Sequence, residues 1–439
     1  MNKLPHEQRG EARIKKAERS QVEMVTLSLE DRLDKGHRVR MVWEYVMSLD
    51  LSELYGEIQA RKGVVGRDAV DPRILFSLWL FSTIEGCTSA RRLEVLTQRD
   101  IAYMWLCGGV GVNYHLLSDF RVKHGGILER ILKDSIAVLL HQNLIKLETV
   151  AQDGMRVRAS AGGGSFRREA SLEECLEKAE RHMADLAKED SAGEEKRSKA
   201  AQERAAREKT ERIKKALEEI KIIKEKREST KKKRDDTREI RASTTDPEAR
   251  RMKMGDGGFR PALNVQFCTD GDSRLIVGVD VVNQGSDQGL MEPMHQQIVS
   301  NYKKSPKKYL VDGGFTTVND INELTNSGTI VFGALKNVED QLDAGKNPYA
   351  KKPKDSQAMA DFRARMGTKD AQEIYSKRAS IAEFSNAECR NRGLSQFRVR
   401  GLIKAKAQVF WHVLAHNFNR FINLDYLKIF TRTNVPLTC

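Results

Sequence analysis

The chain has 439 residues, of which 39% are hydrophobic and 31% are charged. That length is roughly two to three times the usual domain size, so more than one domain is expected, and the apolar share suffices for one sizeable core. The formal net charge of +14 favours a polyanionic partner, and nucleic acid is a better candidate than an acidic membrane surface. The alternative is that the positive charge only increases solubility and binds no ligand.

The six cysteines are scattered along the chain, with no C-x-x-C pair and no histidine at zinc-ligand spacing. This pattern excludes a disulfide framework and a structural zinc site. The N-terminus lacks the apolar segment of a secretory signal, and no apolar run approaches the roughly 20 residues needed to cross a bilayer. We therefore expect a soluble, cytoplasmic protein that makes no membrane contact.

Residues 1–40 read as a charged lead-in, and residues 41–143 have a helical pattern throughout. Asp71-Pro72 is typical of a helix start, and Ser89 suits the N-cap of another helix. Short helices with arginine on their exposed faces fit a helix-turn-helix-like DNA reader. A helical bundle that only packs or dimerises fits the same pattern, and no recognition helix stands out.

The hydrophobic period changes after Lys146. Residues 147–151 indicate a buried strand that ends at Asp153, before Gly154. Residues 155–159 then alternate apolar side chains with arginine, which predicts another extended segment before a glycine-rich loop.

Residues 166–251 differ in composition from the rest of the chain. Between residues 167 and 251 there is no aromatic side chain, Pro247 is the only proline, and charges of both signs are dense. Apolar residues recur at helical spacing in two stretches, and the periodicity lapses around residues 191–193. We interpret the segment as two long helices that form a protruding antiparallel hairpin; a disordered charged linker and an intermolecular coiled coil are the alternatives. The apolar positions are Leu172, Cys175, Ala179, Met183 and Leu186 in the first stretch and Ile213, Leu217, Ile220 and Ile223 in the second.

A globular pattern resumes after residue 251. The order of elements without the insertion is β–β–β–α–β–β–α, which is the order of a ribonuclease-H-like α/β core. The expected catalytic domain comprises residues 144–165 and 252–425, is interrupted by the charged hairpin, follows the all-α N-terminal domain, and leaves a tail at residues 426–439. The expected elements are strands at residues 262–268, 275–282, 308–311 and 329–335 and helices at residues 286–300 and around Trp411.

Two aspartates occupy matched places in this pattern. Asp153 and Asp312 each end a predicted strand, and each precedes glycine. Because neighbouring strands lie about 4.8 Å apart, carboxylates at their ends can share a pair of divalent ions. An all-oxygen site of this kind suits magnesium, and two such ions suit phosphodiester displacement. The alternative is that each Asp-Gly pair only makes a turn.

A third acid is found further along the chain. Residues 375–394 read YSKRASIAEFSNAECRNRGL. This run resembles the C-terminal signature of DDE transposases from bacterial insertion sequences, in which Tyr, Arg, a catalytic Glu and a basic residue are regularly spaced. Tyr375, Arg378, Glu383 and Arg390 fall onto those roles in turn. The segments QDGMRVRASA at residues 152–161 and VDGGF at residues 311–315 are similar to the two aspartate motifs of the family.

The run departs from the family signature in two ways. Four residues separate Arg378 from Glu383, where the signature has three, and this places them about 140° apart on one ideal helix. Ser380 and Glu383 also fit a capping box, which would give Glu383 a purely structural role at the start of a helix. The box is compatible with catalysis if the helix begins at Ser380, Tyr375 and Arg378 lie just before it, and Glu383 faces the site from the first turn. Arg390 stands where the family has lysine, and both contact phosphate. Glu388 is the reserve candidate for the third acid.

The resemblance implies an enzyme that cuts and joins DNA at the terminal inverted repeats of its own element. Asp153, Asp312 and Glu383 would hold two Mg²⁺, for which Mn²⁺ can substitute. The DNA backbone would be contacted by Tyr375, Arg378, Arg390, Arg156 and Arg158. Pairing two DNA ends requires at least a homodimer.

Two other hypotheses remain open. One is a sequence-specific DNA-binding protein that derives from such an enzyme and has lost catalysis. The other is a ribonuclease-H-like nuclease that cuts DNA without strand transfer.

Overall fold

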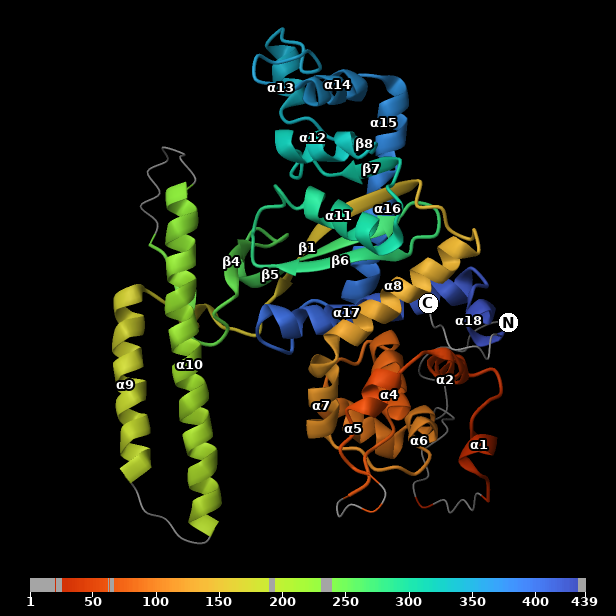
Figure 1. Ribbon diagram of the computed structural model, residues 1–439, viewed down its shortest axis with the longest axis vertical. Coiled ribbons are helices and arrows are strands. Elements are labelled where there is room, and N and C mark those ends of the chain that lie inside the picture. Colours follow the sequence, from red (N-terminus) through yellow and green to blue (C-terminus); the bar gives the residue numbers. More distant parts are fainter. Residues whose placement is uncertain are drawn as a thin grey trace, which may run out of the picture.

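The computed structural model describes Ser20 and residues 26–61, 63, 67–188, 194–229 and 239–432. Within these residues, a group of helices precedes the sheet (Figure 1). They are α1 (Leu29–Arg32), α2 (Arg38–Ser48), α3 (Ser52–Gly56), α4 (Pro72–Ile84), α5 (Ala90–Arg99), α6 (Ile101–Cys107), α7 (Tyr114–Lys123) and α8 (Gly125–His141).

Two of these helices start where the sequence predicts. The Asp71 carboxylate accepts a hydrogen bond from the Arg73 N–H, and Pro72 occupies the first turn of α4. The Ser89 hydroxyl accepts a hydrogen bond from the Arg92 N–H at the start of α5. Both predictions are confirmed, since each side chain satisfies a backbone donor that the first helical turn leaves free.

The N-terminal helices share their core with a helix from the other end of the chain. Helix α17 (Leu402–Asn423) lies between these helices and the sheet (Figure 1). The ring of Trp411 lies 4.9 Å from that of Phe76 and 6.4 Å from that of Trp79. Its Nε1 donates a hydrogen bond to the Arg121 carbonyl oxygen at 3.0 Å. One apolar cluster therefore runs from the N-terminal helices into the sheet.

The expected lead-in and tail are both shorter than predicted. Helix α2 begins at Arg38, before residue 40, and Val39 is fully buried. Helix α18 (Leu427–Arg432) returns to α2, where the rings of Phe430 and Tyr45 lie 5.8 Å apart. Burial of these apolar side chains extends the folded region at both ends. Most of the expected lead-in and residues 433–439 lie outside the described residues.

A mixed sheet forms the centre of the molecule. Its strands are β1 (Thr149–Arg158), β4 (Arg250–Lys253), β5 (Phe259–Asp270), β6 (Ile276–Val282), β7 (Lys308–Val311) and β8 (Ile330–Gly333). Strand β5 pairs antiparallel with β1 on one side, and with β4 and β6 on the other. Strand β7 is parallel to both β1 and β8. The spatial order is therefore β6–β5–β1–β7–β8, and β4 extends the β6 edge.

Three details of the sheet region differ from the expectation. Strand β1 is continuous, so Asp153 lies in its middle rather than at its end, because β5 pairs with β1 along nine residues from Val150 to Arg158. Helix α12 (Val318–Asn326), which was not predicted, joins β7 to β8, since parallel neighbours require a crossover connection. Helix α11 (Met291–Tyr302) starts after residue 286, because Asp320 accepts hydrogen bonds from the Gly289 and Glu292 N–H groups and holds the preceding loop.

The remaining helices follow β8. They are α13 (Val338–Asp343), α14 (Gln357–Met366), α15 (Lys369–Ser376) and α16 (Arg378–Asn391). Helix α16 packs on β1 and β5, which brings its side chains to the middle of the sheet.

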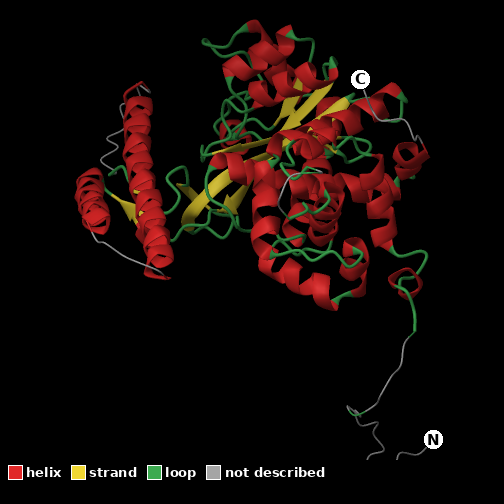
Figure 2. Ribbon diagram, turned by 60° about the horizontal axis from the view of Figure 1, so that its bottom comes forward, coloured by secondary structure: helices red, strands yellow, loops and turns green. Residues whose placement is uncertain are grey.

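The charged segment forms two long helices, α9 (Glu169–Lys188) and α10 (Glu194–Ser229), which we call the helix pair. Figures 1 and 2 both show the helix pair beside the rest of the molecule, which we call the body. The short strands β2 (Phe166–Arg167) and β3 (Ala242–Ser243) pair with each other at the base of the helix pair. The expected joint at residues 191–193 lies outside the described residues. The helix pair is held by a small cluster of buried residues, which are Leu172, Ala179, Ile213, Ala216, Ile220 and Ala242.

Candidate active site

Asp153 and Asp312 lie on neighbouring strands. Gln152 of β1 pairs with Val311 of β7, so the two aspartates are the next residues on parallel, adjacent backbones. Each carboxylate accepts a hydrogen bond from the N–H of the glycine that follows it, at 2.9 Å for Asp153 and 2.6 Å for Asp312. Their arrangement is the one expected, although Asp153 reaches it from the middle of a strand.

The two Asp-Gly pairs have different local structures. The Phe315 N–H donates to the Asp312 carbonyl oxygen, so Asp312 begins a turn, as the alternative interpretation expects. Gly154 lies within β1, where an added Cβ would lie 2.5 Å from the Gln266 Nε2 and would also meet the Asp287 carboxylate. Glycine lets these side chains lie directly over the backbone, and a larger residue at this position would force Gln266 and Asp287 to shift.

The carboxylate of Asp153 is poorly hydrated and has acidic neighbours. Burial raises its pKa above the usual value, and the charges of Asp287 and Asp312 raise it further. The guanidinium of Arg378 and the Gly154 N–H act in the opposite direction. Because burial and the neighbouring acids disfavour the ionised form of Asp153, a cation placed beside this carboxylate would stabilise its ionised form.

Helix α16 begins at Arg378, so neither the capping box nor the helix start at Ser380, which the sequence left open as alternatives, is present. Lys377 is the N-cap, and the Ser380 hydroxyl donates to the Lys377 carbonyl oxygen at 2.9 Å instead of capping. Tyr375 belongs to the last turn of α15. The helix starts early because Lys377 continues in helical conformation directly from α15.

Arg378 connects the acids despite its angular offset from Glu383. Its Nη1 lies 3.8 Å from the Asp153 Oδ1, and its Nη2 lies 3.9 Å from the Glu383 Oε1. The long arginine side chain spans the offset that an ideal helix imposes. Burial raises the pKa of Tyr375, Arg378 lowers it and Asp312 raises it, so the phenol lies near Arg378 and Asp312.

Glu383 lies at the rim of this group. Its side chain is 66% exposed, against 23% for Asp153. Among the described residues, no three His, Cys, Asp or Glu side chains are close enough together to hold one ion. Glu388, the reserve candidate, is held instead by Arg392 at 2.6 Å.

A basic cavity of about 830 Å³ opens beside Asp153, next to Gly154. Three arginines that the sequence predicts as DNA contacts, Arg156, Arg158 and Arg390, all line it. Arg156 is held by the partly buried carboxylate of Asp287 at 2.8 Å. The cavity is therefore cationic at its wall and adjoins the acids at one end.

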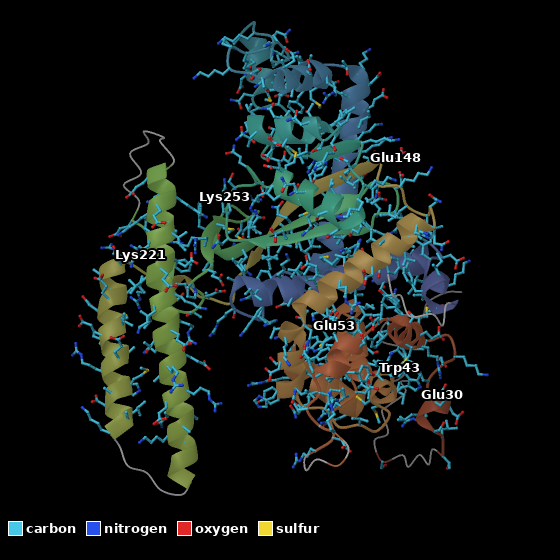
Figure 3. All side chains as sticks on the ribbon, viewed as in Figure 1. Glu30, Trp43, Glu53, Glu148, Lys221 and Lys253 are labelled. Atoms are coloured by element: carbon cyan, nitrogen blue, oxygen red, sulfur yellow. The ribbon has the colours of Figure 1, made fainter. Side chains whose placement is uncertain are left out.

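Two further cations of the cavity were not predicted. Lys253 ends β4 and Arg260 lies near the start of β5, and both line the same space (Figure 3 labels Lys253). Arg260 pairs with Asp256, the one acid among the lining residues, at 2.7 Å. They lie about a hundred residues from Arg156 along the chain, and only pairing of β5 with β1 brings them together.

Two polar residues near Asp153 were also missed. Asn386 donates from its Nδ2 to the Asp153 Oδ2 at 2.9 Å. Asp287 accepts from Asn264 and Gln266 on β5 as well as from Arg156. Asn386 could have been predicted, because it follows Glu383 by about one helical turn and so lies on the same side of the helix. No local sequence pattern points to Asp287.

The donor set fits a magnesium site. Asp153 and Asp312 offer carboxylate oxygens, which this ion prefers. The Asn386 Oδ1 is buried and accepts no hydrogen bond from the described residues, so one more oxygen donor is free beside Asp153. Glu383 would complete the set by a change of side-chain conformation.

Two family models match the chain. Residues 27–123 match a model described as a transposase domain (DUF772), and residues 200–418 match a model described as a transposase DDE domain. Together they cover more than two thirds of the sequence, although the second begins within α10 and does not include Asp153. No curated protein and no solved structure matches the chain. None of the helices in the described part of the chain is long and apolar enough to span a membrane. With transposase models matched at both its N-terminal helices and its catalytic region, the chain belongs to the DDE transposases of insertion sequences and is an enzyme of that type.

Proposed function

We propose that this transposase binds the terminal inverted repeats of its own element and cuts and joins DNA with Mg²⁺. Water attacks a phosphodiester at the element end in line, and the 3′-hydroxyl leaves. That 3′-hydroxyl then attacks a phosphodiester of the target DNA in line, and the 3′-oxygen of the target strand leaves with a proton as the new bond forms, without a covalent protein intermediate. The observation that carries the proposal is the adjacency of Asp153 and Asp312 on paired strands.

The catalytic core is ribonuclease-H-like in this proposal. It comprises residues 144–165 and 252–425, with the helix pair and its base, residues 166–251, as an inserted hairpin. The strand order β6–β5–β1–β7–β8, with three antiparallel strands followed by two parallel ones, supports this assignment. Residues 41–143 form the N-terminal domain for DNA binding or dimerisation, although its core continues into α17.

Asp153, Asp312 and Glu383 are proposed to hold two Mg²⁺, or Mn²⁺ in their place. The ions would stabilise the attacking and leaving oxygens of the displacement. The protein keeps the Asp153 carboxylate in one orientation through the Gly154 N–H. Arg378 reaches from Glu383 to Asp153 and can donate to a phosphate oxygen between them.

The DNA backbone is proposed to run through the basic cavity. Arg156, Arg158 and Arg390 line it. Tyr375 is not one of the residues that line this cavity, and we propose that it contacts the DNA backbone from beside Asp312. Contacts from such side chains fix the register of the scissile phosphate without reading sequence. Joining two ends requires a homodimer at least, and the reaction would take place in the bacterial cytoplasm.

One observation favours a catalytically silent DNA-binding protein as the second candidate. The Glu383 carboxylate is 66% exposed and remains apart from the aspartates. In such a protein, DNA would bind through the cavity while the acids served no reaction.

Cleavage of DNA that carries the inverted repeats separates these functions. Wild-type protein with Mg²⁺ is expected to cut the ends and yield joined products, whereas Asp312→Ala binds the same DNA and cuts none. Asp340→Ala, on helix α13 and outside the acids proposed to hold metal, is the matched control and should cut normally. Cleavage by Asp312→Ala would refute the site, cleavage without joined product would indicate a nuclease, and binding without cleavage by the wild type would support the silent protein.

A further inference from the structure

Asn386 lies against the proposed metal site, in addition to the three acids proposed to hold the ions. It is on α16, three residues after Glu383, and its side chain is 6% exposed. Its Nδ2 donates to the Asp153 Oδ2 at 2.9 Å, while the Gly154 N–H donates to the Asp153 Oδ1 at 2.9 Å. Both carboxylate oxygens of Asp153 are thus oriented by neutral donors.

The position of Asn386 is set by the packing of its neighbours. Ser385 is fully buried, and its hydroxyl lies 2.9 Å from that of Thr269 on β5. Cys389, one turn further along α16, is also fully buried. The helix is therefore pinned to the sheet on both sides of Asn386, and its amide has little freedom to move away from Asp153.

The other half of the amide is unsatisfied. The Asn386 Oδ1 is buried and accepts no hydrogen bond from any described residue. A buried acceptor without a donor is unfavourable, and the exceptions in folded proteins call for an explanation such as an ion or a water. A carbonyl oxygen beside a carboxylate is suited to a cation or to the hydrogen atoms of its hydration water.

Arg378 provides the opposite case on the same carboxylate. Its Nη1 is buried, makes no hydrogen bond with the described residues, and lies 3.8 Å from the Asp153 Oδ1. Asp153 is thus flanked by a free acceptor at Asn386 and a free donor at Arg378. The donor matches a phosphate oxygen, and the acceptor matches a hydrated cation.

We propose that Asn386 is a positioning residue of the metal site. Its amide N–H holds the Asp153 carboxylate, and its Oδ1 accepts a hydrogen bond from water that a divalent cation retains at Asp153. Such partners outside the direct ligands orient the ligands and raise metal affinity. This inference rests on the proposed function, because it requires that Asp153 bind the cation.

The test measures Mn²⁺ binding by the full chain without DNA, using the electron paramagnetic resonance signal of free Mn²⁺. Asn386→Leu keeps the volume of the side chain and removes both polar atoms, and we expect it to weaken Mn²⁺ binding roughly 10- to 100-fold. Asn391→Leu, the same change at an exposed position of α16, should bind Mn²⁺ like the wild type. Asn386→Ala gives the same comparison if leucine prevents folding.

A second variant separates positioning from packing. Asn386→Asp keeps an oxygen acceptor and should retain Mn²⁺ affinity, but it cannot donate to Asp153 and should lower the kcat of DNA cleavage. Because EDTA removes the metal ion, unfolding temperatures measured in EDTA report packing alone. We expect the variants that lose Mn²⁺ affinity to unfold in EDTA at the same temperature as the wild type. Wild-type Mn²⁺ affinity in Asn386→Leu would overturn the proposal. It would also be overturned if the Leu and Asp variants lost Mn²⁺ affinity equally and both unfolded at lower temperatures in EDTA, because packing alone would then explain the loss.

Asp153→Asn distinguishes failure of this inference from failure of the proposed function. If Asp153→Asn binds Mn²⁺ like the wild type, the metal site itself is wrongly assigned. If Asp153→Asn loses binding and Asn386→Leu does not, the site is supported and only the role of Asn386 is refuted.

Discussion

The body and the helix pair are built in contrasting ways. In the body, helices from both ends of the chain meet around Trp411, and one apolar cluster includes most of the buried side chains. The helix pair has a cluster of only six buried residues, none of them aromatic. Burial therefore determines the body, whereas a thin apolar stripe with surrounding charge determines the pair.

Charge also distributes differently between the two regions. Along the pair, exposed lysines meet glutamates across the helices, as Lys214 does with Glu180 at 3.0 Å. At the base of the pair, Arg250 of β4 forms a shielded ion pair with Glu219 of α10, with side chains 17% and 15% exposed. Figure 3 shows Lys221 on α10 and Lys253 on the neighbouring edge of the sheet. The acids therefore lie in the region with the large apolar cluster, whereas ion pairs and a thin apolar stripe hold the helix pair.

The largest expected effect is in the shared core. Trp411→Ala removes a buried ring at the centre of the core that α17 shares with the N-terminal helices. We expect the free energy of unfolding to fall by about 3–5 kcal/mol. All four tryptophans lie outside the helix pair, so urea unfolding followed by tryptophan fluorescence reports the body. Hydrogen exchange in α9 and α10 should change little short of global unfolding. Equal loss of protection in both regions would show that they are one cooperative unit.

Acid should weaken the body through two buried histidines of α17. Burial lowers the pKa of His412 to about 3 and that of His416 to about 4. In the unfolded chain both imidazoles take up protons near pH 6.5, so stability is complete above that pH and falls as the pH drops toward the folded values. For each group the slope rises from about half of 1.4 kcal/mol per pH unit at pH 6.5 to nearly the full value at pH 5, so the two together lose on the order of 3 kcal/mol over this range.

The matched variant for this pH dependence is His412→Phe, because the His412 Nδ1 makes no hydrogen bond with the described residues. It should remove the His412 share of the acid-dependent loss in urea unfolding followed by fluorescence; His124 and His295, whose pKa values burial also lowers, contribute to the remainder together with His416. Buried acids such as Asp270, whose pKa is raised, act with the opposite sign nearer pH 4, so the measurement stays above pH 5. An unaltered acid response in His412→Phe would refute the assignment.

A smaller effect is expected in the helix pair. Ile213→Ala removes a side chain that is 1% exposed from the small cluster, and we expect a local loss of about 2 kcal/mol, at the low end for such changes because few neighbours surround it. Faster hydrogen exchange in α9 and α10 would report it, while the fluorescence midpoint of the body stays at the wild-type value. A shift of that midpoint as large as the local loss would contradict the separation of the two regions.

The smallest effect concerns the charges along the pair. A double-mutant cycle on Lys214→Ala and Glu180→Ala should give a coupling below about 1 kcal/mol, because both side chains are about half exposed. The coupling should shrink further in high salt. A coupling of several kcal/mol, read from hydrogen exchange in the pair, would mean that charge rather than the apolar stripe holds the helices.

The sequence predicted most elements of the body but not their ends. Caps such as Asp71 and Ser89 are local signals, so the helices they start were located correctly. The start of α16 was missed because it depends on how α15 leads into it rather than on a cap. Helix α12 was missed as well, although the parallel pairing of β7 and β8 requires a crossover.

By itself, the sequence determined the family, the two Asp-Gly motifs and the division between a globular body and a charged, aromatic-free segment. These are properties of residue type and spacing, which survive without coordinates. Only the tertiary structure decided that Asp153 lies within a strand, that Lys253 and Arg260 join Arg156 around one cavity, and that Asn386 is set against Asp153. Those relations arise from strand register and from helix packing between segments that are distant in sequence. A local sequence pattern does not specify such contacts.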